Sequence, residues 1–153
     1  MKEELQLQLV KKYPKILRDY GGDMMKTCMA WGIETGDGWY DLLDECMGKM
    51  QLICDLASTK ENEVQVIAEQ IKSKFATLRF YYRVEGLENL DPEKSKIIWN
   101  IISDMENKAD SKSSRTCEIC GKNGKTNESG WRTTLCEEHS KKKAKPLDDV
   151  TEF

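Results

Sequence analysis

Three cysteines and the only histidine of the chain stand close together near its C-terminal end, in the spacing C-x2-C-x15-C-x2-H. Thiolates and an imidazole at this spacing are typical of a tetrahedral zinc site, in which two pairs of residues fill four positions around the ion. Gly121 follows the first pair and suits the tight turn of a knuckle, because glycine tolerates positive φ. We therefore expect a structural Zn²⁺ whose ligands are Cys117, Cys120, Cys136 and His139.

The predicted zinc site restricts the chemistry open to the chain. A redox pair or a disulfide is the alternative for Cys117 and Cys120, but redox pairs usually begin a helix, and this one lies in a glycine-containing turn. Four protein ligands leave no position for water, so the ion should support folding. With His139 on zinc, no histidine remains as a general base, and we expect a non-enzymatic protein. The enzyme alternative would need Cys28, or Asp41, Asp44 and Glu45 with an added metal.

Charge is distributed unevenly along the 153 residues. Residues 107–145 carry ten Lys or Arg against five Asp or Glu, whereas the rest of the chain carries 14 against 22. The basic region offers a nucleic-acid surface, although the acidic body argues against broad contact with duplex DNA. Its candidate contacts are Lys122, Lys125, Arg132 and the lysines at 141–143. No run of apolar residues predicts a membrane helix or a signal peptide, so we expect a cytoplasmic chain with reduced thiols.

The remaining sequence predicts helices and a hairpin that position these residues. Apolar residues recur at helical spacing over residues 39–57, and Asp91-Pro92 begins a second long helix that ends near Ala109. A shorter helix is expected over residues 2–13. Residues 64–71 and 77–84 are rich in β-branched and aromatic residues and predict an antiparallel hairpin. We therefore expect an α+β fold, with a few helices packed on a small antiparallel sheet and a C-terminal zinc knuckle.

Composition divides the chain into four parts. The α+β core domain is expected over residues 1–109, and the polar stretch 110–114 is expected to be a linker. A Cys3His zinc module is expected over residues 115–140, and residues 141–153 are expected to form a disordered tail. Trp131 and Leu135 are the expected contacts between the zinc module and the core. A small-ligand site between subunits would suit a homo-oligomer.

The second predicted strand alternates, and its outer row combines Arg79, Tyr81 and Arg83. Arginine offers forked donors to phosphate, and tyrosine offers a ring for stacking on a base. With Trp39 and Tyr40, this row is the candidate ligand-binding surface. The alternative is ordinary packing of long side chains on a half-exposed sheet.

Several motifs in order resemble a group of uncharacterised bacteriophage and prophage proteins. They are GDGWYDLLDEC, EQIKSKFATLRFYY, and CEICG followed by GWRTTLCEEH, so the resemblance covers about residues 12–139. Members often have glycine where this chain has Ala76. The resemblance implies a phage origin and the cytoplasm of a host cell, but it supplies no activity.

We therefore expect a zinc-containing phage accessory protein that binds a host component. Counter-defence would be its role, either by sequestering a nucleotide immune signal or by inhibiting a defence protein. A nucleic-acid-binding module that uses the basic zinc region is the first alternative, and an enzyme without a catalytic histidine is the second.

Overall fold

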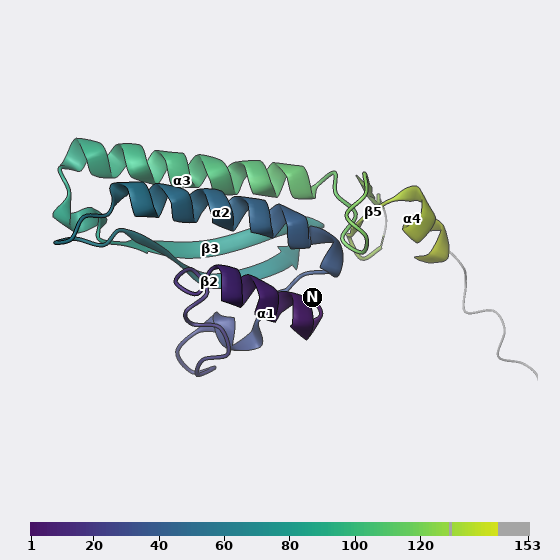
Figure 1. Cartoon of the computed structure of the whole chain (residues 1–153). Helices are drawn as coiled ribbons and strands as arrows, with labels where there is room; N and C mark the ends of the chain where they lie inside the picture. Colours follow the sequence, from purple (N-terminus) through teal and green to yellow (C-terminus); the bar gives the residue numbers. More distant parts are fainter. Residues whose placement is uncertain (129, 144–153) are drawn as a thin grey trace, which may run out of the picture.

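Two long helices lie side by side on one face of a small sheet in the computed structural model, which describes residues 1–128 and 130–143 (Figure 1). The helices are α2 (Tyr40–Ala57) and α3 (Pro92–Ser113). The sheet has the order β1 (Ile33–Glu34), β2 (Gln65–Lys74) and β3 (Thr77–Glu85). β2 and β3 form the predicted antiparallel hairpin, and β1 pairs with β2 in parallel. The predicted α+β class is confirmed, with one short parallel strand added to the hairpin.

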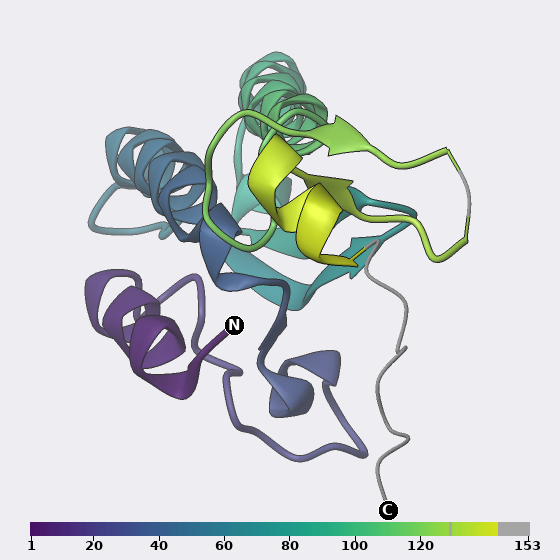
Figure 2. The same cartoon turned by 90° about the vertical axis from the view of Figure 1, so that its right-hand side faces the viewer.

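The opposite face of the sheet is covered by the N-terminal part of the chain. It contains α1 (Glu3–Lys12) and the 3₁₀ helix η1 (Cys28–Trp31), which lie on the far side of the sheet from α2 and α3 (Figures 1 and 2). β2 carries a bulge between Ala68 and Gln70, and the Ala68 N–H donates to the carbonyl of Ile16 at 2.9 Å. The bulge thus ties the N-terminal segment to the central strand.

The hydrophobic core lies on both faces of the sheet. Helical spacing brings one stripe of α2 to the sheet, and alternation along β3 brings Leu78 and Phe80 to the helices. Two further 3₁₀ helices, η2 (Asp37–Trp39) and η3 (Leu87–Asn89), lead into α2 and α3. Across the described residues, none of the helices is apolar over a length that would cross a membrane.

The C-terminal module stands beyond the end of α3 (Figure 1). It contains the two-stranded sheet of β4 (Lys125–Thr126) and β5 (Thr134–Leu135), followed by α4 (Glu137–Lys143). The expected disordered tail is therefore wrong for residues 141–143, which complete α4. The rest of that tail, 144–153, lies outside the described residues.

The linker expected over residues 110–114 is also wrong, because α3 continues through Ser113. Ser113 is fully buried. Its Oγ accepts the N–H of Leu78 at 2.8 Å and donates to the carbonyl of Asp110 at 2.5 Å. Serine, lysine and aspartate suggest a loop by composition, but a buried hydrogen bond to β3 fixes this last turn as helix.

The turn between β2 and β3 uses two residues of left-handed conformation, Phe75 (φ 52°) and Ala76 (φ 68°). Two-residue hairpins with this twist usually contain Asn or Gly. The carbonyl of Ala76 accepts a hydrogen bond from Thr134 Oγ1 at 2.9 Å, and Ala76 is fully buried. Positive φ is unfavourable for alanine, and the turn that contains Ala76 is the part of the hairpin that contacts the zinc module.

Replacing Ser113 with alanine removes the acceptor of a buried backbone N–H. We expect S113A to lower the free energy of unfolding by about 1–3 kcal/mol. Ser111 is exposed on the same helix, so S111A is the matched control and should stay within about 0.5 kcal/mol of the wild type. Urea unfolding followed by circular dichroism measures both, and equal stability of the two variants would contradict the assignment.

Candidate metal centre

The structure brings the four predicted zinc ligands together. Cys117 and Cys120 lie in the turn that follows α3, Cys136 immediately precedes α4, and His139 lies on α4. Their ligand atoms all lie within 4.8 Å of one another. Within the part of the chain that the structure describes, this is the one group of three or more His, Cys, Asp or Glu residues that could hold a metal ion.

The spacing of these atoms fits a tetrahedral ion. Zinc bonds of about 2.3 Å to sulfur and about 2.0 Å to nitrogen place two sulfurs about 3.8 Å apart and a sulfur and nitrogen about 3.5 Å apart. Cys120 Sγ lies 3.7 Å from Cys136 Sγ, and His139 Nδ1 lies 3.6 Å from Cys117 Sγ. His139 Nδ1 is 3.1 Å from Cys136 Sγ, somewhat closer than the ideal. Three thiols and one imidazole at these distances fit Zn²⁺.

Backbone N–H groups around the site favour the thiolate form that metals bind. Burial alone raises the pKa of the Cys117 thiol. Hydrogen bonds from the backbone N–H groups of Cys136, Cys120 and Ile119 outweigh burial and lower that pKa to about 6. A thiolate at neutral pH is the protonation state that a zinc ligand requires.

The knuckle packs directly against the start of α2 through backbone atoms. The Gly38 N–H donates to the carbonyl of Glu118 at 2.8 Å. A Cβ at Gly38 would lie 2.1 Å from the carbonyl oxygen of Cys117, and a Cβ at Gly36 would lie 2.1 Å from that of Glu118. The two glycines of the GDGW motif are therefore required by this close approach. Sequence reasoning missed their role, although two glycines so close together beside a helix start were a usable signal.

Trp39 belongs to this contact and not to a ligand surface. The side chain is fully buried in the core, and its Nε1 donates to the carbonyl of Thr116 at 2.9 Å. The expectation that Trp39 contacts a ligand is therefore wrong. Tyr40 is only half-buried and packs against the same core. The helical spacing of apolar residues over 39–57 begins at Trp39, so the burial of this side chain agrees with that pattern.

The arginines of the outer β3 row are already engaged by carboxylates. Arg79 lies 3.5 Å from Asp110 of α3. Arg83 forms ion pairs with three carboxylates, at 3.4–3.7 Å, from Asp19, Glu69 and Glu85. Tyr81 between them is exposed. These pairs favour the packing alternative over a free phosphate site.

The structure does not bear out Trp131 as a docking contact of the zinc module, and Leu135 packs inside the module. Leu135 is buried beside Cys117 and Cys136, which belong to the module itself. Trp131 is 83% exposed, so it does not join the module to the core. Backbone hydrogen bonds and the buried pair of Thr134 Oγ1 with the Ala76 carbonyl join the two parts.

The residues of the enzyme alternative are scattered or already paired. Cys28, the thiol of that alternative, is exposed. The other two cysteines outside the zinc module, Cys46 and Cys54, are buried, and burial raises the pKa of Cys46 to about 12. Asp44 accepts hydrogen bonds from Lys12 and Tyr13. Glu45 forms ion pairs with two lysines of the helix layer, Lys49 and Lys112.

Comparison with known proteins adds no relative, since the chain matches no family model, no curated protein and no solved structure. The function must therefore be inferred from the geometry of the site and from the sequence.

Loss of one ligand is expected to release the metal. The purified wild type should contain one zinc per chain, whereas C120S should lose its zinc to a chelator, because three ligands bind more weakly than four. A structural zinc site contributes about 10–16 kcal/mol of binding free energy to folding, so α4 should also unfold. Cys28 is exposed like Cys120 and is no ligand, so C28S should keep its metal. Elemental analysis tests this, and metal-free wild type would contradict the site.

The glycine contact predicts a second effect. G38A forces the knuckle away from α2, and overpacking of this kind costs about 1–3 kcal/mol. We expect a lower melting temperature and faster release of zinc to a chelating dye. G48A is the matched control, because a Cβ at Gly48 meets only the Tyr13 hydroxyl at 3.1 Å and alanine is the better helix former by about 1 kcal/mol. Equal zinc release from both variants would contradict the role of Gly38.

Proposed function

We propose that this chain is a non-enzymatic phage accessory protein that binds a host protein in counter-defence. In this proposal a structural Zn²⁺ holds the binding surface in place. The observation that carries it is Trp131, which is 83% exposed on the zinc module. The phage assignment comes from the sequence resemblance.

Hydrogen bonds hold the backbone that carries the exposed indole. Asn127 Nδ2 donates to the carbonyl of Trp131 at 2.9 Å, and Asn127 Oδ1 accepts the N–H of Thr133 at 2.8 Å. Lys143 Nζ lies 3.4 Å from the same Trp131 carbonyl. A large aromatic side chain held at low conformational cost is typical of the residues that dominate protein interfaces.

The zinc site supports a binding role over a catalytic one. Its four ligands are all protein side chains, and they include the only histidine of the sequence. A closed site of this kind stabilises a fold and has no position for a reacting water.

Charge pairing supports a protein partner over a nucleotide or a nucleic acid. Arg79 and Arg83 are engaged by carboxylates, so a phosphate would have to displace them. In α4, Lys141 pairs with Glu137 at 2.6 Å, and Lys142 pairs with Glu138 at 3.0 Å. These acceptors weaken the cationic field that nucleic-acid binding requires.

Infection assays test the proposal. The chain is expressed in host strains that each carry one defence system, and each strain is challenged with a phage that the system restricts. We expect the wild type to restore plaque formation in at least one strain and W131A to lose that effect. Trp31 is exposed on η1, at a different part of the surface, so W31A is the matched control and should act like the wild type.

Zinc content and thermal melting show that both tryptophan variants are folded. No restoration by the wild type in any strain would contradict the counter-defence role. Restoration by W131A equal to that by W31A would contradict the placement of the binding surface on the zinc module.

A further inference from the structure

The outer side of the α2–α3 layer carries four exposed aliphatic side chains. Leu52 and Leu56 are 58% and 73% exposed on α2, and Ile97 and Ile101 are 52% and 38% exposed on α3. Each pair has the i,i+4 spacing that places its members on one side of its helix. Four branched aliphatics at this exposure, on two neighbouring helices, are typical of an interaction surface.

The two helices run in opposite directions, which brings the four side chains to one end of the layer. The contact of Glu45 near the start of α2 with Lys112 near the end of α3, at 2.8 Å, fixes this direction. Leu52 and Leu56 therefore lie at the level of Ile97 and Ile101. We call these four residues the aliphatic patch.

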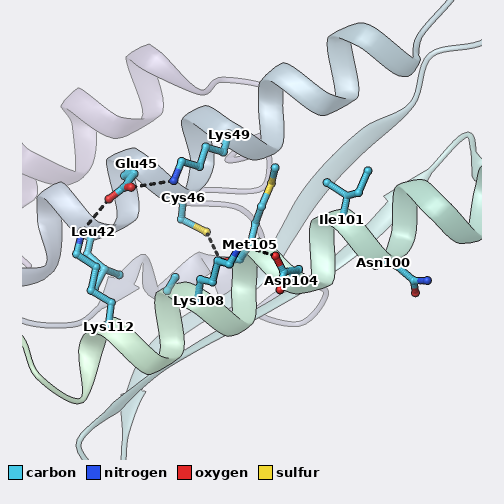
Figure 3. A pocket seen from close by; sticks show the side chains of 11 residues that line it. Leu42, Glu45, Cys46, Lys49, Asn100, Ile101, Asp104, Met105, Lys108 and Lys112 are labelled. Carbon is cyan, nitrogen blue, oxygen red and sulfur yellow. Dashed lines mark hydrogen bonds and ion pairs between the residues drawn. The ribbon is translucent and has the colours of Figure 1, made fainter.

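A groove leads from the aliphatic patch toward the zinc end of the layer. It has a volume of about 460 Å³, with Cys46, Met105 and Ala109 among the residues between the helices. Figure 3 shows Lys49 and Lys112 turned toward Glu45 over this groove. The groove thus has an apolar floor and a rim that carries both signs of charge.

We propose that a second copy of this chain covers the aliphatic patch and the groove, around a two-fold axis parallel to α2 and α3. This axis lays α2 of one copy over α3 of the other while every residue keeps its level along the layer. Leu52 and Leu56 then meet Ile97 and Ile101 of the second copy. A two-fold axis perpendicular to the helices, through the middle of the layer, would instead place the aliphatic patch of one copy over the charged end of the other.

The rim charges are complementary in this arrangement. α2 offers Glu45 and Lys49, and α3 offers Lys112, Lys108 and Asp104. Glu45 of one copy comes to the level of Lys112 of the other on both sides of the axis. Lys49 comes to the level of Lys108, whose charge is paired with Asp104 at 2.7 Å. A surface that is complementary to itself is what a two-fold dimer requires.

The area of this face is sufficient for a dimer. At 1.5 Å per residue α2 is about 27 Å long, and two adjacent helices are about 20 Å across. Two copies would bury about 1,100 Å² in total on this estimate, just above the minimum for a specific interface. The dimer would carry both zinc modules at the same end, because each follows its own α3. This inference goes beyond the proposed function and does not depend on it.

Sedimentation of the zinc-loaded full chain over a concentration series tests the dimer. We expect the wild type to have the mass of a dimer and L56E/I97E to have the mass of a monomer. Leu7 and Met25 are exposed on the other side of the sheet, so L7E/M25E is the matched control and should remain a dimer. Wild type that is monomeric throughout would overturn the proposal and leave the face to a different protein.

Mixing tests the orientation. Because α2 faces α3 of the second copy, L56K and I97E should dimerise more tightly when mixed than either does alone. Circular dichroism and zinc content show that the variants are folded, and L52K/I101K is an independent disruption of the same face. A dimeric L56E/I97E, or no gain on mixing, would overturn the assigned interface.

Discussion

Backbone contacts between the zinc knuckle and the start of α2 join the two parts of the chain. The carbonyls of Thr116 and Glu118, on either side of the predicted ligand Cys117, accept hydrogen bonds from the Trp39 indole and the Gly38 N–H. A metal at the Cys3His cluster would orient the knuckle that carries these acceptors, and Trp39 in turn belongs to the core under α2. Metal binding at this cluster would therefore stabilise the helix layer as well as the module itself.

The contact between the zinc knuckle and the start of α2 also determines which surfaces remain accessible to a partner. Trp39 and both glycines of GDGW are buried or enclosed in this contact and are not free to bind a partner. The last turn of α3 is fixed by the hydrogen bond between Ser113 and Leu78 of β3. α3 thus enters the module without a flexible linker. The position of the module relative to α3 is thus fixed before a partner binds, and a lower ordering cost leaves more of the contact energy for affinity.

The sequence predicted what depends on periodicity and ligand spacing. Helical repeats located α2 and α3, alternation located the hairpin, and C-x2-C with C-x2-H located the Cys3His cluster. The errors fall where tertiary contact overrides local preference. Polar composition concealed the helical end at Ser113, and the exposure of Trp131, which was expected to contact the core, depends on tertiary packing that no local pattern shows. The pairing of Arg79 with Asp110 joins residues far apart in sequence and was equally hidden.

The aliphatic patch and Trp131 could both contribute to binding of one partner, because they lie at opposite ends of the helix layer. The aliphatic patch lies at the end of the helix layer away from the zinc knuckle, while Trp131 lies beyond the end of α3. Association through the helix layer would therefore leave the zinc modules uncovered. With two modules at one end, a partner with two matching sites would bind the second at a high effective concentration. A modest contact through each Trp131 would then suffice for a stable complex.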